Sequence, residues 1–426
     1  MNILLLGSGG REHALAKKIT ESPNCQQLFI APGNAGTATC GTNLNFKATD
    51  FEAIRNLLLE KDISMVVVGP EDPLVKGIYD FITQDKDTRH VQVIGPSAFS
   101  AQLEGSKSFA KSFMARHAIP TASYREFTAD NFGEGLVYIS GHSLPIVLKA
   151  DGLAAGKGVL ICSTHEEAAE GFKAMIQDAR FGEAGKKVVI ESYLKGIEVS
   201  VFVLTDGQSF VVLPEAKDYK RVGEGDTGLN TGGMGAVSPV PFFDDELKKK
   251  ILERIVWPTI KGLQKENMVY KGFIFLGLMV DNGEPYMIEY NCRMGDPETE
   301  VVIPRITADL VELFKAVGNG TLAEQQLSVD ERTAVTTIAV SGGYPGEYVN
   351  GKEIFGLEQP KNADVMVYHA GTTSTTAGVV TNGGRVLAVT AFGNNIKEAA
   401  DKSREALSTL CFEGMYYRRD IGYEFD

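Results

Sequence analysis

The chain has 426 residues and a formal net charge of −13, from 42 Lys and Arg against 55 Asp and Glu. This length favours about three domains, each able to bury a core. The acidic balance argues against a general nucleic-acid binder, which needs a basic surface. A hydrophobic content of 43% argues against a disordered chain.

Cysteine usage and the N-terminus predict a cytoplasmic protein. The five cysteines are scattered and form no C-x-x-C pair, which is typical of reduced thiols. The first residues lead directly into an apolar run at 3–6, without a basic region or a cleavage site, so no signal peptide is expected. The longest apolar stretch, near 273–280, is too short to span a membrane. We therefore expect neither a membrane nor a nucleic acid as a partner.

Residues 1 to about 100 alternate predicted strands and helices. Short apolar runs at 3–6, 28–30, 65–68 and 91–94 predict strands, and helical spacing appears at 11–19 and 51–60. Fully apolar strands that alternate with helices predict a parallel, doubly wound sheet. Ligands of such sheets bind beyond the carboxyl ends of the strands. Here those ends are rich in glycine, at 7–11, 31–36 and 69–73.

The rest of the chain divides into three further predicted parts. A helix runs from Ser106, its predicted N-cap, to about His117. A compact α+β insert follows, with strands at 146–150, 158–162 and 187–191 and a helix at 166–179. A core resumes with strands at 198–204, 210–213, 273–280 and 285–291, a glycine-rich loop at 222–238 and a helix at 245–265. From about 333 the chain is a strand-rich α+β domain with one late helix at 395–410.

The first glycine loop only partly fits a dinucleotide fingerprint. Gly7 and Gly9 match the G-x-G-x-x-G pattern, but Glu12 replaces the third glycine. The second strand ends in Ala31-Pro32, without the acidic residue that would hold the ribose of NAD. Both departures argue against NAD. A helix N-terminus beside Arg11 favours a phosphate site, and a simple tight turn is the alternative.

A second glycine loop, at 152–158, differs from a Walker A loop. Its spacing is one residue short, no Ser or Thr follows Lys157, and it joins two strands. It suits a flap over a triphosphate. A plain hairpin turn would explain the glycines but not a lysine close to Lys149. Because Lys149 lies in an apolar strand, it requires a buried anion or solvent.

The strand at 285–291 carries the candidate metal ligands. Glu289 and Asn291 project to one face of the strand, and Arg293 continues this face. Two such oxygen ligands together with phosphate oxygens suit Mg²⁺. A strand end with solvated polar groups is the alternative. The glycine-rich composition of residues 217–235 favours a ligand-binding loop or lid over a purely structural connection. Composition alone does not choose between the two.

These motifs occur together, and in this order, in one family. They are Gly9-Gly10-Arg11-Glu12-His13-Ala14-Leu15, Pro32-Gly33-Asn34-Ala35-Gly36-Thr37, Val68-Gly69-Pro70-Glu71, Leu103-Glu104-Gly105-Ser106-Lys107, the run from Lys149 to Gly158, Asn230-Thr231-Gly232-Gly233-Met234-Gly235 and the run from Glu289 to Thr299. The chain resembles, over its whole length, the phosphoribosylamine–glycine ligases or glycinamide ribonucleotide synthetases of the ATP-grasp superfamily.

The resemblance implies a multidomain α/β and α+β enzyme with four parts. These are an N-terminal phosphoribosylamine-binding domain at 1–101, an ATP-grasp core at 102–120 plus 192–325, a mobile insert at 121–191 and a C-terminal domain at 326–426. It also implies a reaction in which ATP, glycine and 5-phosphoribosylamine give glycinamide ribonucleotide, ADP and phosphate, an early step of purine synthesis. We expect a monomer.

The resemblance further assigns a role to each residue that matches a motif. ATP would be bound by Lys107, Lys149, Gly156, Lys157, Glu191, the Leu194 backbone and Glu198. Phosphoribosylamine would be bound by Gly9, Gly10, Arg11, Asn34 and Glu71. Glu289 and Asn291 would hold Mg²⁺ or Mn²⁺, and Arg293 and Asp296 would be catalytic, with Arg293 facing the transferred phosphoryl group.

One feature departs from the family pattern, and a second, which the family commonly shares, departs from the pattern of the wider ATP-grasp superfamily. The usual Gln-Asp-His-Lys run is here Lys217-Asp218-Tyr219-Lys220, so Tyr219 receives no acid–base role. Leu278 and Met279 stand where many ATP-grasp enzymes carry a further metal-binding acid.

Two alternative functions remain open from the sequence. One is another ATP-grasp carboxylate–amine ligase that uses a different acid. The other is a nucleotide-binding regulatory protein without turnover, against which the joint presence of Lys107, Lys149, Glu289 and Asn291 argues.

Overall fold

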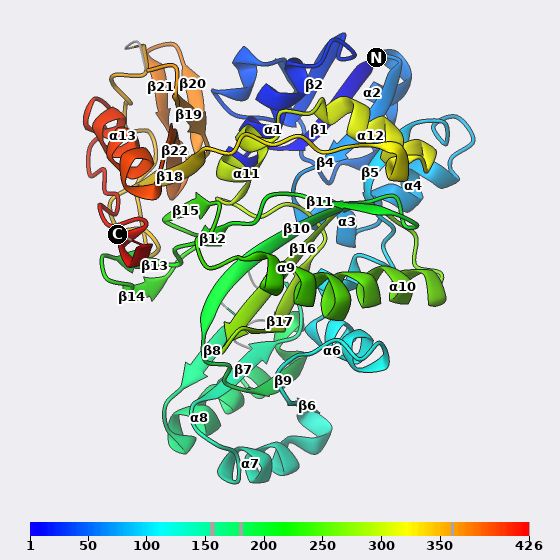
Figure 1. Ribbon diagram of the computed structural model, residues 1–426, viewed down its shortest axis with the longest axis vertical. Coiled ribbons are helices and arrows are strands. Elements are labelled where there is room, and N and C mark those ends of the chain that lie inside the picture. The colour runs from blue at the N-terminus through cyan, green and yellow to red at the C-terminus, as the bar shows by residue number, and fades with distance from the viewer. Residues whose placement is uncertain (154–157, 179–181, 359–361, 426) are drawn as a thin grey trace.

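A computed structural model describes residues 1–153, 158–178, 182–358 and 362–425. Figure 1 shows the N-terminal sheet beside the C-terminal domain at one end, the insert at the opposite end and the central strands between them. No helix in these described ranges is long and apolar enough to cross a membrane.

The N-terminal part is the expected parallel, doubly wound sheet. Its strands have the order β3–β2–β1–β4–β5, and every neighbouring pair is parallel. The strands are β1 Asn2–Gly7, β2 Gln27–Pro32, β3 Thr42–Asn43, β4 Ile63–Val68 and β5 Gln92–Pro96. The order of connections reverses between β1 and β4, where doubly wound sheets bind their ligands. Gly7 and Gly69 stand at this position.

Helices complete the N-terminal part and lead into the core. Apolar faces such as Ile54, Leu57 and Leu58 of the second helix pack on the sheet. The helices are α1 Gly10–Thr20, α2 Phe51–Glu60, α3 Glu71–Val75, α4 Ile78–Gln84, α5 Gln102–Gly105 and α6 Lys107–Arg116. The predicted N-cap of α6 is confirmed, because Ser106 Oγ accepts the N–H of Phe109 at 3.1 Å.

The N-terminal sheet continues into the core as one nine-stranded sheet. Strand β16 pairs with β5 in antiparallel register, Tyr270 against Pro96 and Lys271 against Gly95. The core strands are β10 Ile197–Thr205, β11 Phe210–Val212, β16 Tyr270–Asp281 and β17 Glu284–Asn291. One apolar cluster therefore runs from Leu4 of β1 to Leu278 of β16, and the two parts share a core as well as a sheet.

The insert has its own sheet and its own apolar core. The sheet order is β6–β9–β7–β8, and Phe127, Phe172 and Met175 are fully buried between it and two helices. Its elements are β6 Tyr124–Thr128, α7 Phe132–Ser140, β7 Ile146–Ala150, β8 Val159–Cys162, α8 His165–Ile176 and β9 Lys187–Ser192. Helix α8 ends at Ile176, before the predicted end at 179. The predicted flap residues Gly156 and Lys157 lie outside the described residues.

Two core segments differ from the prediction. The helix expected at 245–265 is α9 Asp245–Ile251, a π-helical turn Leu252–Val256 and α10 Trp257–Lys265. The π turn precedes Pro258, which has no N–H to donate and would clash with a carbonyl of the preceding turn.

The glycine-rich segment expected as a loop contains three strands, so that prediction is wrong. They are β13 Arg221–Gly223, β14 Thr227–Asn230 and β15 Gly235–Ser238. β15 and the preceding β12, Lys217–Asp218, join the C-terminal sheet, where Val237 lies opposite Val335.

The C-terminal domain is an antiparallel sheet covered by one helix, as predicted. The sheet order is β12–β15–β18–β22–β19. Its other elements are β18 Thr333–Val340, β19 Val365–His369, β20 Thr372–Thr375, β21 Gly378–Thr381, β22 Arg385–Gly393 and the covering helix α13 Ile396–Ser408. Two helices, α11 Thr299–Arg305 and α12 Leu310–Asn319, precede the domain. Asn395 caps α13 by accepting the N–H of Glu398 at 2.9 Å.

Two histidines, the buried His13 and the half-buried His369, join the N-terminal sheet to the C-terminal domain. His13 Nδ1, on α1, accepts the N–H of His369 at 2.8 Å, and Asn34 donates to the His369 carbonyl at 2.8 Å. A Cβ on Gly36 would lie 2.2 Å from the His13 ring, so glycine is required for this close approach. Burial lowers the pKa of His13 to about 3 and that of His369 to about 4. Both rings are therefore neutral near neutral pH.

We expect this contact to weaken in mild acid. The unfolded chain, with a histidine pKa near 6.5, binds protons that the folded chain excludes until about pH 3 to 4. Stability should then decrease as the pH falls across this window, by up to about 1.4 kcal/mol per pH unit for each histidine. His13→Gln keeps an acceptor but cannot titrate, so its melting temperature should fall less between pH 6.5 and 4. His90→Gln, at an exposed site, is the control, and equal slopes in all three proteins would contradict the interpretation.

Candidate active site

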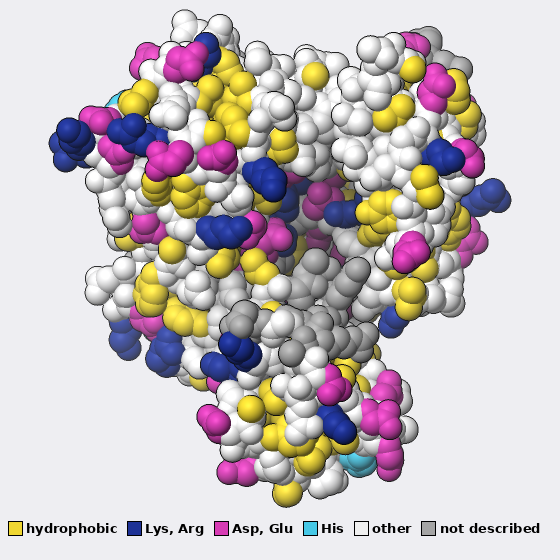
Figure 2. All heavy atoms as spheres, turned by 180° about the vertical axis from the view of Figure 1, so that it is seen from behind, with side chains coloured by type: hydrophobic (Ala, Val, Ile, Leu, Met, Phe, Trp, Pro, Cys, Tyr) yellow, Lys and Arg dark blue, Asp and Glu magenta, His cyan; other side chains and the backbone are white. Residues whose placement is uncertain are grey.

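Two neighbouring cavities lie where the parts of the molecule meet. The central cavity, of about 430 Å³, is bounded by the core, the insert, the N-terminal sheet and the C-terminal domain. The outer cavity, of about 650 Å³ and more open, lies between the N-terminal sheet and the C-terminal domain. Figure 2 views the molecule from behind the view of Figure 1 and shows a hollow with Lys, Arg, Asp and Glu side chains gathered around it. Asp296 and Arg385 line both cavities.

One end of the central cavity holds a buried carboxylate between two lysines. Glu191 Oε2 lies 3.0 Å from Lys111 Nζ and 3.1 Å from Lys149 Nζ, and all three side chains are buried. The predicted need of Lys149 for a buried anion is thus met by Glu191. Burial lowers the pKa of Lys111 to about 8, although Glu191 opposes this shift. Glu191 Oε1 has no hydrogen-bond partner within the described residues, so it can accept from a ligand such as the amino group of a nucleobase.

The predicted metal ligands lie in the wall of the same cavity. Glu289 and Asn291, from the end of β17, both face it, together with Lys107 from the start of α6. The Asn291 amide nitrogen donates to Glu104 Oε1 at 3.2 Å and to the Tyr290 carbonyl at 3.1 Å. Its amide oxygen therefore remains available beside the Glu289 carboxylate. Lys107 Nζ donates to the Gly152 carbonyl at 3.2 Å, and burial lowers the pKa of Lys107.

Arg293 is fixed by two carboxylates from other elements. Its Nη2 lies 2.7 Å from Glu104 Oε1, and its Nε lies 3.2 Å from Glu71 Oε2. Burial opposes ionisation of Glu71, but Arg293 and Arg11 hold its pKa below the usual value. Glu104 was not predicted as a site residue, although it belongs to the Leu103–Lys107 motif. This network holds the guanidinium of Arg293 in one position.

The opposite wall comes from β10 and the segment after β12. Lys220 forms an ion pair with Glu198 and lies 3.8 Å from Asp218 Oδ1. Ser200 Oγ donates to Glu298 Oε1 at 3.0 Å. Burial is the main cause that raises the pKa of Glu298 to about 7, and the negative charge of Asp218 is the second. Glu198 is thus in the cavity, as the resemblance implied, with Lys220 as its partner.

The outer cavity has one wall from each end of the chain. Gly9 and Asn34, both predicted, form the N-terminal wall, and Asn34 Nδ2 donates to the Ser8 carbonyl at 2.8 Å. The opposite wall is formed by Ala370, Gly371, Thr372, Thr373 and Asn382. None of these C-terminal residues belonged to a motif in the sequence, so the prediction missed them.

Arg11 and Glu12 occupy places that the sequence did not indicate. A phosphate was expected at the helix N-terminus beside Arg11, and the structure places Arg11 in the wall of the central cavity, with its Nε 2.7 Å from Glu12 Oε1. Glu12 Oε2 accepts the Gly9 N–H at 2.6 Å. A Cβ on Gly69 would lie 2.1 Å from Glu12 Oε1. The carboxylate of Glu12 therefore takes the helix N-terminal position at which a phosphate was expected.

The other predicted site residues are distributed as follows. Glu71 lines the central cavity and not the outer one. Gly10 packs against the Glu300 carboxylate, and a Cβ there would lie 2.3 Å from Glu300 Oε1. Leu194 lies in the connection between β9 and β10, outside the described residues that line either cavity.

Arg385, from β22, forms the boundary between the cavities. Its Nη1 donates to the Gly232 carbonyl at 2.7 Å and the Asp296 carbonyl at 2.9 Å, and lies 3.1 Å from Asp296 Oδ1. This arginine was not predicted, because it follows an ordinary Asn-Gly-Gly turn. Its position allows one cation to face an anion in either cavity.

The fold, together with a sequence model of an ATP-grasp (A) domain that matches residues 105–299, defines an ATP-grasp protein. The biotin carboxylase domain of 2-oxoglutarate carboxylase from Hydrogenobacter thermophilus, solved with MgADP, ADP and bicarbonate, has the same fold, with a TM-score of 0.74. The similarity covers 97% of this chain and 91% of that chain at 17% identity.

Sequence models of three domains narrow this class to one family. They describe the N domain, the ATP-grasp (A) domain and the C domain of phosphoribosylglycinamide synthetase, and match residues 1–104, 105–299 and 334–424. The chain belongs to the phosphoribosylglycinamide synthetase family.

Close relatives carry the corresponding enzyme name. The phosphoribosylamine–glycine ligase of Vibrio vulnificus strain CMCP6 is 45% identical over 99% of this chain and 98% of its own length. The solved phosphoribosylamine–glycine ligase of Thermotoga maritima is 36% identical, with a TM-score of 0.85, over 99% of this chain and 100% of that chain.

Proposed function

We propose that this protein is an ATP-dependent ligase that joins glycine to 5-phosphoribosylamine in purine biosynthesis. The products are glycinamide ribonucleotide, ADP and phosphate. The family and the names of relatives that match over their full length support this reaction. The structural observation that carries it is the meeting of two polar cavities at Asp296 and Arg385, because the reaction must bring an activated acid to a separately bound amine.

The central cavity suits ATP and the activation of glycine. A carboxylate is a poor electrophile, and transfer of a phosphoryl group from ATP converts it into an acyl phosphate. Lys107, Lys149 and Arg293 line this cavity, and their charges would offset those of the phosphoryl group in transfer. The free oxygen of Glu191 suits the adenine amino group, and Glu198 suits the ribose hydroxyls.

Glu289 and Asn291 fit a divalent cation that ATP brings with it. No group of three or more His, Cys, Asp or Glu side chains in the described ranges could hold a metal ion alone. One carboxylate and one free amide oxygen match an ion that takes its other ligands from phosphate oxygens and water. When bound, Mg²⁺ or Mn²⁺ would neutralise phosphate charge.

The outer cavity suits phosphoribosylamine. The hydroxyls of Thr372 and Thr373 and the side chain of Asn382 offer polar partners for a ribose phosphate. Asp296 lines both cavities, and its carboxylate would attract the amino group towards the activated glycine. Arg385 also lines both cavities and would hold an anionic group in either of them.

The same proposal covers organisation and location. We propose that the functional parts are 1–101, 102–120 plus 192–325, 121–191 and 326–426, and that the enzyme is a cytoplasmic monomer. The insert has an apolar cluster of its own, which supports treating it as a domain separate from the central ATP-grasp part.

The reaction is tested by substrate dependence and by isotope transfer. ADP release should require glycine and should be weak with alanine, serine or aspartate, since the site must hold one small acid. Glycine labelled with ¹⁸O in its carboxylate should transfer one label to inorganic phosphate when phosphoribosylamine is present. Unlabelled phosphate would rule out an acyl phosphate, and a preference for another acid would assign the enzyme to a different ligase reaction.

The metal pair should control turnover more than folding. Glu289→Gln keeps the side-chain volume but removes the charge that faces a cation. We expect a loss of at least ~100-fold in kcat/KM, equivalent to about 2.7 kcal/mol, with little change in melting temperature. Glu284→Gln, at the other end of β17 and paired with Lys250, is the control. Near-normal turnover of Glu289→Gln at saturating Mg²⁺ would remove Glu289 from the metal site.

The two cavities should respond to different substitutions. Arg385→Lys keeps the charge but loses the planar hydrogen-bonding geometry, so the kcat/KM for phosphoribosylamine should fall by ~10- to 100-fold. The Kd of ATP should change little in this variant, whereas Lys149→Met should weaken ATP binding first. Arg332→Lys, on a half-exposed ion pair of the C-terminal domain, is the control. A selective loss of ATP binding in Arg385→Lys would contradict the division between the cavities.

A further inference from the structure

The C-terminal segment 416–424 contacts the loop that follows β12. Lys217 Nζ lies 2.6 Å from Glu424 Oε1, and the Tyr219 hydroxyl donates to Glu424 Oε2 at 2.9 Å. The alternate residues Asp218 and Lys220 line the central cavity instead. Lys217 and Tyr219, the two residues that differ from the family pattern, therefore share Glu424 as a partner. This contact lies on the side of the loop that faces away from the cavity.

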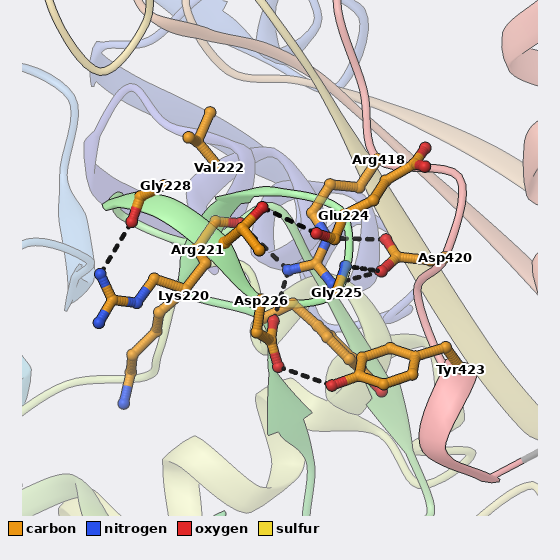
Figure 3. Close-up of polar contacts among 12 residues, drawn as sticks. Lys220, Arg221, Val222, Glu224, Gly225, Asp226, Gly228, Arg418, Asp420 and Tyr423 are labelled. Atoms are coloured by element: carbon orange, nitrogen blue, oxygen red, sulfur yellow. Dashed lines mark hydrogen bonds and ion pairs between the residues drawn. The ribbon is translucent and has the colours of Figure 1, made fainter.

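Arg418 is the centre of this contact (Figure 3). Its side chain is fully buried, with Nη1 2.6 Å from Asp226 Oδ1 and Nε 2.8 Å from Asp420 Oδ1. The same Nη1 donates to the Arg221 carbonyl at 3.1 Å. A buried guanidinium is tolerated only with such partners in place, so Arg418 couples the position of the C-terminal segment to that of the β13–β14 hairpin.

Further bonds secure the tip of this hairpin. Asp420 Oδ2 accepts the Gly225 N–H at 2.7 Å, and Glu224 Oε1 accepts the Arg419 N–H at 3.2 Å. Two tyrosine hydroxyls add to them: Tyr416 donates to the Val222 carbonyl at 3.0 Å and Tyr423 donates to Asp226 Oδ2 at 3.1 Å. All four residues of β14 are exposed. Because an isolated two-stranded hairpin is marginal in water, these bonds are needed to hold it in one place.

The hairpin begins and ends in the active site. Lys220 precedes β13 and pairs with Glu198, and Thr231 follows β14 and donates its N–H to the Lys220 carbonyl at 2.7 Å. The next carbonyl, of Gly232, accepts from Arg385 at 2.7 Å. A displacement of the hairpin would therefore move the walls of both cavities.

We propose that residues 416–424 act as a C-terminal clamp, with Arg418 and Glu424 as positioning residues for the ligation. The clamp holds Lys220 and the Thr231–Gly232 turn in place while the activated glycine waits for the amine. With the clamp weakened, water replaces the amine as acceptor, which returns glycine and phosphate while ADP has already formed. This inference rests on the proposed function.

Hydrogen exchange tests the clamp without any substrate. Glu424→Gln removes the charge opposite Lys217 but keeps the shape of the side chain. Amides at 221–230 should then exchange at least about 5-fold faster, while those of the insert strands β7 and β9 stay unchanged. Glu413→Gln, which removes the partner of Lys352 elsewhere in the C-terminal domain, is the control. Unchanged exchange at 221–230 in Glu424→Gln would overturn the clamp.

The coupling of ATP use to product formation tests its role in the reaction. Tyr416→Phe combined with Tyr423→Phe removes two hydroxyl bonds to the hairpin and leaves Arg418 paired, so the chain should fold. We expect a ~5- to 30-fold lower kcat/KM for phosphoribosylamine and more than one ADP for each product molecule. Tyr417→Phe is the control within the same segment: the half-buried ring of Tyr417 packs against the core of the C-terminal domain, so this variant should keep the ratio at one. A lower melting temperature with an unchanged ratio would overturn the positioning role.

The two tests also separate this inference from the proposed function. If the unsubstituted protein does not ligate glycine to phosphoribosylamine, the proposed function fails, while the exchange experiment still decides whether the segment restrains the hairpin.

Discussion

Charge that is buried must be compensated, and in this protein the compensating groups come from different parts of the chain. Arg293 of the core is held by Glu71 of the N-terminal domain and by Glu104. Arg385 of the C-terminal domain is held by Asp296. Removing one partner of such a partly buried pair leaves the other charge poorly solvated and without compensation. The need for compensation thus fixes the domains relative to one another, and it fixes them at the active site.

The same constraint prepares the site for its ligands. Glu191 is balanced by two lysines yet retains an oxygen that has no partner among the described residues. Asn291 uses its amide nitrogen internally and leaves its oxygen free. Groups that are already oriented lose little entropy when they bind substrate, and a low-dielectric site strengthens their electrostatic effect. The acyl phosphate that we propose is prone to hydrolysis, which explains the value of a second cavity that shares Asp296 and Arg385 with the first.

The sequence predicted local structure and contiguous motifs well, and long-range pairing poorly. Helix α2 occupies the predicted residues 51–60, since its cap and apolar spacing are local. The strands within the glycine-rich segment were missed, because β15 becomes a strand by pairing with β18, about a hundred residues later. For the same reason the motifs indicated the walls of the central cavity but not Arg385 or Thr372. The sequence placed Arg11 beside the start of α1, and the structure adds that its side chain lines the central cavity, where it is bonded to Glu12.

The run from Lys217 to Lys220 shows how a departure from a family pattern can leave the chemistry of a site intact. Alternation along an extended backbone sends Asp218 and Lys220 into the cavity and sends Lys217 and Tyr219 to the other side. The two unusual residues meet the same carboxylate, Glu424, so they are coupled to each other through it. Burial, and then Glu424, raises the pKa of Tyr219, which keeps its hydroxyl protonated as a donor. Substitution of Lys217 or Tyr219 alone would leave Glu424 with one partner fewer. Neither substitution would alter Asp218 or Lys220, which face the cavity. The two substitutions are therefore best understood as part of the interface between this loop and the C-terminus, and the residues that the family pattern retains are those that line the central cavity.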